Sequence, residues 1–199
     1  MAHGRRRTPS RAERLRGLIV TEGTVTEPQY LQLLKQQLPR ASASVTVKGA
    51  GQDPLSVLDK CIELRAEAKV RGKPYDWCCC VVDVDEHVML ERCLVEARRS
   101  AVEVVVTNLK FEVWLLWHCI DLGAARASRQ LDDLARRHGV LVGKDLSARF
   151  PVGNYLDAVT RARTADPELA TRRTGPNPSS SMPALLDLMN RTAGASDRA

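Results

Sequence analysis

The sequence lacks the features that mark membrane-spanning and exported proteins. It contains no run of about eighteen apolar residues, the length needed to cross a bilayer as a helix. The basic N-terminal stretch MAHGRRRTPSRAERLR is followed only by the short apolar run Leu18–Val20, which is too short for a signal peptide. We therefore expect a cytoplasmic protein that makes no contact with a membrane.

The sequence also lacks paired cysteines with the spacing of zinc ligands. There are six cysteines, and none belongs to a C-x-x-C pair, which argues against a zinc site. Three of them are consecutive, Cys78–Cys80, and neighbouring residues of a strand point to opposite faces of a sheet. We interpret them as small apolar core residues of a protein kept in a reducing compartment.

Charge is concentrated at the two ends of the chain, which has a net charge of +6. Residues 1–16 contain six arginines and one glutamate, and residues 161–199 contain six arginines and four acidic residues. The segment between them is close to neutral. A basic tail can follow nucleic-acid phosphates, but an arginine-rich chain can equally have solvated basic tails, and the composition leaves both interpretations open.

Strand-like and helix-like patterns alternate through the first 140 residues. The strand-like segments are Gly17–Thr21, Val45–Lys48, Trp77–Val82 and Val102–Thr107. The helix-like segments are Thr26–Leu38, Asp53–Arg71, His87–Arg99, Phe111–Ile120 and Ala124–His138. Two of the strands are continuous apolar runs, which is typical of strands buried on both faces. The alternation predicts an α/β fold with a central, mostly parallel sheet of about four strands, flanked by helices and joined by right-handed crossovers.

The pattern weakens after residue 140, which predicts a different organisation there. Gly143–Phe150 reads as a loop or short turn, and Thr171–Ser181 reads as a loop rich in helix-breaking residues. Helices are expected over Asn154–Thr164 and from about Ser181 to Arg191. The expected division is a flexible basic tail (1–16), an α/β domain (17–140), a helical C-terminal extension (141–192) and a disordered tail (193–199).

Carboxylates follow two of the expected strands directly. Glu22 comes after the first strand, and Asp83 and Asp85 come after the third, in the sequence VVDVDEH. Ligands of open α/β sheets gather at the carboxyl ends of the strands, and alternate residues of an extended segment face the same way. Three carboxylates in one place repel each other unless a cation lies between them, and Mg²⁺ takes oxygen ligands. Taken singly, Glu22 could belong to the turn at Gly23, and either aspartate could cap a helix.

Four ordered motifs resemble those of the RloB-like family. They are IVTEGTVTEPQY, VVDVDEH, TNLKFEVWLLWH and NPSSSMPALLDLM, and together they extend over residues 18–189. The third motif departs from the family pattern at Leu109, where the family has a proline. The domain of this family looks like the Toprim fold, so the resemblance implies a Toprim-like, Rossmann-like α/β domain.

The resemblance also implies an activity. In Toprim domains a glutamate and a D-x-D pair act with Mg²⁺ on phosphodiesters, which implies that Glu22 is an acid/base residue or metal ligand and that Asp83 and Asp85 hold the metal, Mg²⁺ or Mn²⁺. RloB-like proteins are associated with restriction loci and abortive phage defence, often beside an ABC/SMC-type ATPase. The implied function is an anti-phage nuclease acting on DNA or RNA, perhaps tRNA, with such an ATPase as partner protein.

Three further residues are candidates for roles in catalysis. Glu27 could orient water or a second ion, or simply favour the positive end of a helix. Glu112 could face the same edge of the sheet, as its place in the family motif implies, or simply favour the helix dipole. Lys144 could neutralise a phosphate oxygen, or be a solvated loop lysine. His87 could bind metal or shuttle protons, whereas His118 is interpreted as a core histidine.

Two other classes of function fit parts of the sequence. A haloacid-dehalogenase-like phosphohydrolase also uses a D-x-D motif, but its nucleophilic aspartate follows the first strand, where this chain has Glu22. A regulatory or interaction module without catalytic activity, docked on a defence ATPase, would retain the acidic residues as structural remnants. The first would hydrolyse simple phosphomonoesters, and the second would act unchanged after the acids were replaced.

Overall fold

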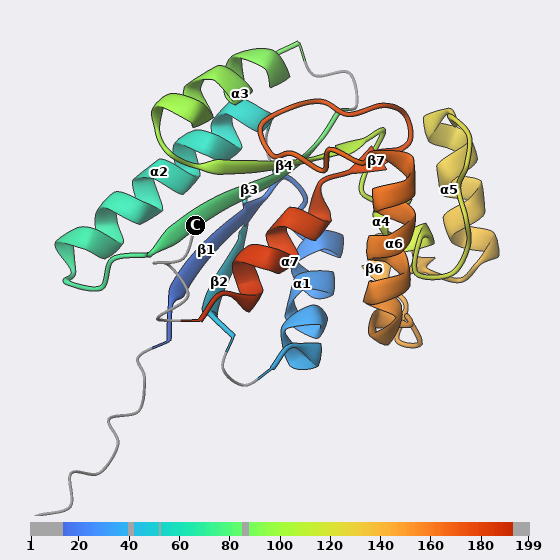
Figure 1. Ribbon diagram of the computed structural model, residues 1–199, viewed down its shortest axis with the longest axis horizontal. Helices are drawn as coiled ribbons and strands as arrows, with labels where there is room; N and C mark the ends of the chain where they lie inside the picture. Colours follow the sequence, from blue (N-terminus) through green and yellow to red (C-terminus); the bar gives the residue numbers. More distant parts are fainter. Residues whose placement is uncertain (1–13, 40–41, 52, 85–87, 193–199) are drawn as a thin grey trace, which may run out of the picture.

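A computed structural model describes residues 14–39, 42–51, 53–84 and 88–192. These residues form an α/β fold in which helices cover both faces of one central sheet (Figure 1). The predicted fold class is therefore confirmed. The predicted tails lie wholly or largely outside the described ranges, and the predicted boundary at residue 140 stays a prediction. Within those ranges, no helix is long and apolar enough to cross a membrane.

The central sheet has five strands in the order β2-β1-β3-β4-β7. Their bounds are β1 Arg16–Thr21, β2 Ser44–Gly49, β3 Trp77–Asp83, β4 Glu103–Asn108 and β7 Ser179–Ser180. The first four are parallel, and β7 pairs with β4 in the antiparallel direction. β1 and β3 are buried along almost their whole length, because helices cover both of their faces.

Helices α2 (Pro54–Val70) and α3 (Leu90–Arg99) cover one face of the sheet (Figure 1). The side chain of Asp53 begins α2 by accepting hydrogen bonds from two backbone N–H groups of the first turn, as the Asp-Pro pair predicts. The core beneath these helices includes four cysteines: Cys61, Cys78, Cys80 and Cys93. We call this side of the sheet the thiol face. Cys79 points to the other side, so the alternation expected for the cysteine run is confirmed.

The opposite face is covered by five helices and holds most of the aromatic side chains of the core. The helices are α1 Thr26–Gln37, α4 Glu112–Leu116, α5 Ser128–Arg137, α6 Tyr155–Ala165 and α7 Met182–Asn190. A short helix η1 (Val152–Asn154) and a small hairpin of β5 (Leu141–Val142) and β6 (Asp145–Leu146) complete this side. We call it the aromatic face.

Two short paired segments lie where the sequence predicts loops. The β5–β6 hairpin falls in or beside the predicted loop Gly143–Phe150, and β7 falls inside the predicted loop Thr171–Ser181. The turn at Gly143 and Lys144 agrees with the predicted loop or short turn. Strands of two residues are too short to show an alternating pattern, so the sequence did not indicate the pairing on either side of it or at β7. The segment around β7 covers the outer edge of β4, because the backbone N–H of Ser181 donates to the carbonyl of Val106 at 3.1 Å.

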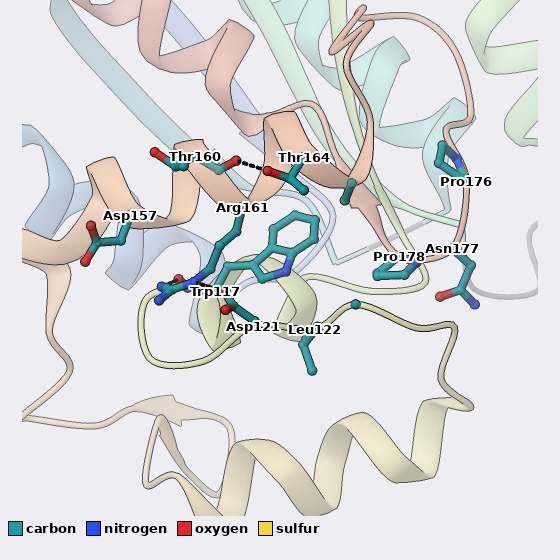
Figure 2. Close-up of a pocket in the computed structure, with 12 residues that line it drawn as sticks. Trp117, Asp121, Leu122, Asp157, Thr160, Arg161, Thr164, Pro176, Asn177 and Pro178 are labelled. Carbon is teal, nitrogen blue, oxygen red and sulfur yellow. Dashed lines mark hydrogen bonds and ion pairs between the residues drawn. The ribbon is translucent and has the colours of Figure 1, made fainter.

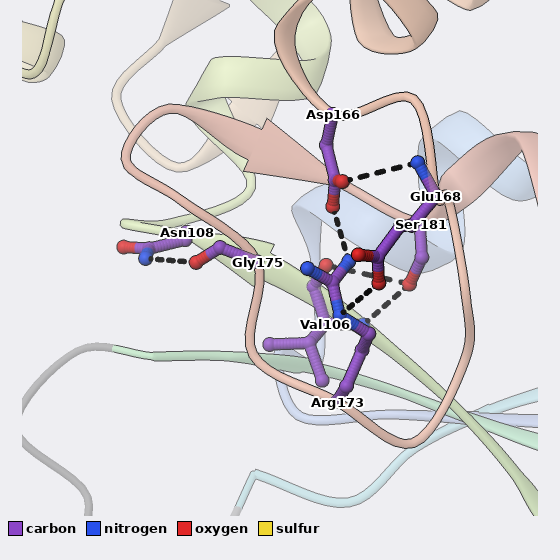
Figure 3. A network of polar contacts seen from close by, with 7 residues as sticks. All are labelled: Val106, Asn108, Asp166, Glu168, Arg173, Gly175 and Ser181. Carbon is purple, nitrogen blue, oxygen red and sulfur yellow. Dashed lines mark hydrogen bonds and ion pairs between the residues drawn. The ribbon is translucent and has the colours of Figure 1, made fainter.

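The loop between α6 and β7 is fixed by a polar network at the end of β4 (Figure 3). The guanidinium of Arg173 pairs with Asp166 at 2.5 Å and with Glu168 at 3.2 Å. The side-chain amide of Asn108 donates to the carbonyl of Gly175 at 2.9 Å. Asn108 therefore anchors this loop and does not cap α4, whose first turn has no side-chain cap.

Candidate active site

The first two predicted site residues lie side by side at the carboxyl edge of the sheet. β1 and β3 are adjacent parallel strands, with Thr21 opposite Val81, and they end in Glu22 and Asp83. The backbone N–H of Glu22 donates to the carbonyl of Val81 at 2.9 Å. The Glu22 carboxylate, in turn, accepts a hydrogen bond from the backbone N–H of Asp83 at 3.3 Å. The sheet order thus brings Glu22 and Asp83 together.

Glu27 reaches the same edge from the first turn of α1. Its side chain is buried, and its Oε1 accepts a hydrogen bond from the backbone N–H of Gly23 at 3.0 Å. A Cβ on Gly23 would lie 2.0 Å from Oε2 of Glu27, so only glycine leaves room for this carboxylate. The E-G pair after β1 therefore has a steric purpose, which is to let the Glu27 carboxylate lie directly against the turn.

Electrostatic coupling shows that Glu112 belongs to the same group of acids. Removal from water is the main cause that raises the pKa of Asp83 well above its ordinary value, and the charges of Glu27, Glu22 and Glu112 add to it. The pKa of Glu27 is also raised, first by burial and then by Glu112 and Glu22, against the lowering effect of its backbone hydrogen bonds. We call these four residues the acidic edge.

The acidic edge has the donor chemistry of a site for a hard cation, but not a finished set of ligands. Its oxygen donors suit Mg²⁺, and a divalent ion would relieve the repulsion that adds to the effect of burial on the two pKa values. Among the residues that the structure describes, no group of three acidic, histidine or cysteine side chains is arranged to hold a metal ion. Asp85 and His87, the other members of the predicted motif, lie outside those residues.

Lys144 lies beside the first turn of α1, far along the chain from the acids. It occupies the turn of the β5–β6 hairpin and is exposed. The hydroxyl of Thr26 donates to its backbone carbonyl at 2.6 Å. Thr26 is the first residue of α1, and its side chain holds the hairpin rather than capping the helix. The backbone of Lys144 therefore contacts Thr26, the residue that directly precedes Glu27.

A buried pair of polar groups joins the helices that carry Glu27 and Glu112. The Nδ1 of His118 lies 3.0 Å from the carbonyl of Trp114, and its Nε2 lies 3.2 Å from the hydroxyl of Tyr30. A carbonyl can only accept, so Nδ1 carries the proton and Tyr30 donates to Nε2. Burial lowers the pKa of His118 to about 4, which keeps the ring neutral. The interpretation of His118 as a satisfied core histidine is confirmed.

Tyr30 also contacts several aromatic rings edge to face, so the pair lies inside an aromatic cluster. The ring of Tyr30 lies 5.6 Å from Phe111, 6.3 Å from Trp114 and 5.9 Å from Phe150, between centroids. Phe111 directly precedes Glu112, and Tyr30 follows Glu27 by one helical turn. The cluster therefore fixes α1 against α4 and, with them, two of the four acids. Residue patterns indicate that these rings are buried, but not that they meet.

A cavity of about 610 Å³ lies between α6, the end of α4 and the loop before β7 (Figure 2). Its lining includes Trp117, Leu122, Arg161 and Asn177. The Nε of Arg161 pairs with Asp121 at 2.5 Å, so the cation nearest the centre of the cavity is already engaged. None of the four acids is part of its lining. The cavity is therefore a feature separate from the acidic edge.

The described geometry is that of a parallel α/β sheet with four acidic side chains gathered at its carboxyl edge. The family model described as RloB-like protein matches residues 17–189. The chain therefore belongs to the RloB-like family, as its motifs suggested. No curated protein and no solved structure matches the sequence.

Proposed function

We propose that this protein is a metal-dependent nuclease that hydrolyses phosphodiester bonds of DNA or RNA. The observation that supports it most is the gathering of Glu22, Glu27, Asp83 and Glu112 at one edge of the sheet, where burial first and then the charges of the other three acids raise the pKa of Asp83. A stable protein gains nothing from such repulsion, so the cluster is better explained by a cationic ligand than by folding. The resemblance to Toprim domains points the same way.

Glu22, Asp83 and Asp85 would hold the ion, which is Mg²⁺ or Mn²⁺ in this proposal. When bound, it supplies a Lewis acid that draws charge from the phosphoryl oxygens. Glu27 is buried and fixed by Gly23, so it is suited to orient an attacking water molecule and to accept its proton. Its raised pKa makes the carboxylate a stronger base than an exposed glutamate.

The remaining two candidates act on charge and position. Glu112 enters the edge from the start of α4 and raises the proton affinity of Asp83 and Glu27. Lys144 supplies positive charge beside Glu27, where a substrate phosphate would need it, because four acids would otherwise repel an anionic strand. The basic ends of the chain would add attraction that is independent of nucleotide sequence.

The biological setting that we propose follows from the family resemblance. The nuclease would be a cytoplasmic effector of abortive phage defence, held in check or delivered by an ABC/SMC-type ATPase. Such a partner explains why an enzyme that damages nucleic acid would be tolerated in an uninfected cell. Purified protein is therefore best assayed both alone and with an ABC/SMC-type ATPase of the kind that the resemblance implies.

The test is cleavage of a panel of single- and double-stranded DNA and RNA, including tRNA, with Mg²⁺ or Mn²⁺. Asp83→Asn and Glu22→Gln are expected to lower the rate by at least about 100-fold, as loss of a group that stabilises transition-state charge does. Asp187→Asn, on the exposed side of α7, is the matched control and should cleave at the wild-type rate. Calorimetry should show metal binding that is lost in an Asp83→Ala/Asp85→Ala double variant.

Two results would contradict the proposal. One is cleavage that survives Asp83→Asn and Glu22→Gln, which would place the chemistry elsewhere. The other is an absence of cleavage, alone or with the ATPase, together with phage protection that survives the same substitutions. That second result would identify the protein as an interaction module of the ATPase, without catalytic activity.

A further inference from the structure

The β5–β6 hairpin presents Lys144 at the tip of a tight turn. Val142 pairs with Asp145, so Gly143 and Lys144 form a turn of two residues. Gly143 has a φ of +65°, the left-handed region that the first position of a type II′ turn requires. Each strand of the hairpin has only two residues, so the pairing between them cannot by itself hold the turn in place. The support comes from α1.

Gln29 binds the second strand of the hairpin with both atoms of its amide. Its Nε2 donates to Oδ1 of Asp145 at 2.7 Å, and its Oε1 accepts from the backbone N–H of Leu146 at 2.7 Å. Thr26, one turn earlier on α1, donates to the carbonyl of Lys144 at 2.6 Å. These three hydrogen bonds attach Lys144 and the two residues after it, Asp145 and Leu146, to the first turns of α1.

The same turns of α1 carry Glu27, which lies between the two residues that hold the hairpin. Glu27 is in turn fixed to Gly23 at the end of β1. The chain of contacts from the acidic edge to Lys144 therefore passes through hydrogen bonds of 3.0 Å or less. Lys110, two residues before Glu112, is held by an ion pair with Asp132. Lys144 has its ammonium group on an exposed turn, where a phosphate can reach it.

We propose that Gln29 and Thr26 are positioning residues that hold Lys144 where it contacts a substrate phosphate at the acidic edge. This inference rests on the proposed function, because it assumes a nucleic-acid substrate. Glutamine suits the role because one side chain must donate to a carboxylate and accept from an N–H at once. If the hydrogen bonds served folding alone, losing them would lower stability without changing what Lys144 contributes.

The experiment measures nucleic-acid affinity against NaCl concentration, with all variants in an Asp83→Asn background so that nothing is cleaved. The probes are a labelled single-stranded RNA and a labelled DNA duplex. Lys144→Ala should weaken binding and reduce the magnitude of the salt slope by about 1, the effect of one phosphate contact. Gln29→Ala should give most of the same loss. The double variant should bind no more weakly than Lys144→Ala alone.

Three further variants separate positioning from folding. Gln37→Ala, an exposed glutamine at the end of α1, is the matched control and should bind like the parent. Gln29→Glu keeps the acceptor but places a carboxylate against Asp145, so it should weaken binding. Adding Asp145→Asn to Gln29→Glu restores a donor and an acceptor with their roles exchanged, and binding should return.

The outcomes are distinct. Additive losses in the Gln29→Ala/Lys144→Ala double variant, or normal binding by Gln29→Ala, would overturn the positioning role. Absence of nucleic-acid binding by the parent would overturn the phosphate contact itself. If the coupling appears but a protein with Asp83 intact cleaves none of the substrates, the proposed hydrolysis fails while the role of Gln29 stands.

Discussion

The two faces of the sheet differ in what their cores are made of and in what they hold. The thiol face is covered by two helices over valine, leucine and cysteine side chains. The aromatic face is covered by five helices, and its core contains a neutral histidine hydrogen-bonded to a tyrosine. Glu27, Glu112 and Lys144 all come from elements of the aromatic face. One face thus mainly stabilises the sheet, and the other also positions the candidate site.

The four acids of the acidic edge therefore depend unequally on the two faces for their positions. Glu22 and Asp83 stand on the strands themselves, which both faces support. Glu27 and Glu112 stand on α1 and α4, which touch each other through the aromatic cluster. Substitutions on the aromatic face should therefore change activity out of proportion to stability, and substitutions on the thiol face should change stability alone.

The largest effect is expected from Gly23→Ala. The new methyl group would lie 2.0 Å from a carboxylate oxygen of Glu27, so Glu27 must move. We expect at least about a 100-fold loss in the cleavage rate, the size reported for small misplacements in a catalytic geometry. Gly123→Ala is the control, since its Cβ meets no atom within 4 Å. Equal rates in the two variants would show that Glu27 has no part in catalysis.

The second prediction compares the loss of a tyrosine hydroxyl on each of the two faces. Tyr30→Phe leaves Nε2 of buried His118 without its donor and should cost about 1–3 kcal/mol of unfolding free energy. Tyr75→Phe, on the thiol face, keeps the ring that lies 5.1 Å from the guanidinium carbon of Arg16 and should cost less than about 0.5 kcal/mol. Urea denaturation measures both. Similar losses would contradict the comparison.

The third prediction is that the free energy of unfolding depends on pH with opposite sign at one acid of each face. The pKa of Asp83 is raised in the folded protein, so folding favours its protonated form and stability falls as pH rises above the unfolded value of about 4. In EDTA, urea unfolding between pH 5 and 8 should show this fall, at most about 1.4 kcal/mol per pH unit for one proton, and Asp83→Asn should reduce it.

The opposite sign is expected at Asp53, on the thiol face. Hydrogen bonds from Ser56 and from backbone N–H groups lower the pKa of Asp53, so its contribution is present above the unfolded value and disappears as pH falls below it. Asp53→Asn should therefore flatten the loss of stability in acid. A loss of stability in acid that is as steep in Asp53→Asn as in the wild type would show that the assignment of sign is wrong.

The smallest effects concern ion pairs. The pair Lys60–Glu63 on α2, at 2.7 Å, is exposed and screened by solvent, so Glu63→Ala should change the free energy of unfolding very little. Asp132→Ala on the aromatic face leaves the half-buried ammonium of Lys110 without its partner and should cost about 1 kcal/mol or more. A larger loss for Glu63→Ala would reverse the ranking of the faces.

The fold and part of the site follow from local patterns. Continuous apolar runs identified the central strands, and two acids directly after them had to meet if β1 and β3 were neighbours, because parallel strands end at one edge. The position of Glu112 was predicted through the family motif rather than from its surroundings. Its coupling to Asp83 appears only when β3 and α4 are placed together in space.

The parts that sequence could not give are contacts between distant residues. Tyr30 and His118 are 88 positions apart, and Gln29 and Leu146 are 117 apart. An apolar stripe predicts that Tyr30 is buried, but it does not predict which group accepts the hydrogen bond from its hydroxyl. Thr26 shows a second limit, because threonine at the start of a helix favours capping by its own side chain, and here a distant carbonyl competes for it.

The last elements of the chain complete the core, and this has a consequence for how the protein is made. β7 closes the edge of β4, and α7 ends where the carbonyl of Met189 accepts from the backbone N–H of Ala43. A chain emerging from the ribosome cannot finish its core until residues near Asn190 have left the exit tunnel. Premature termination would therefore release unfinished chains, so a cell that makes this protein obtains the assembled acidic edge only from full translation of the message.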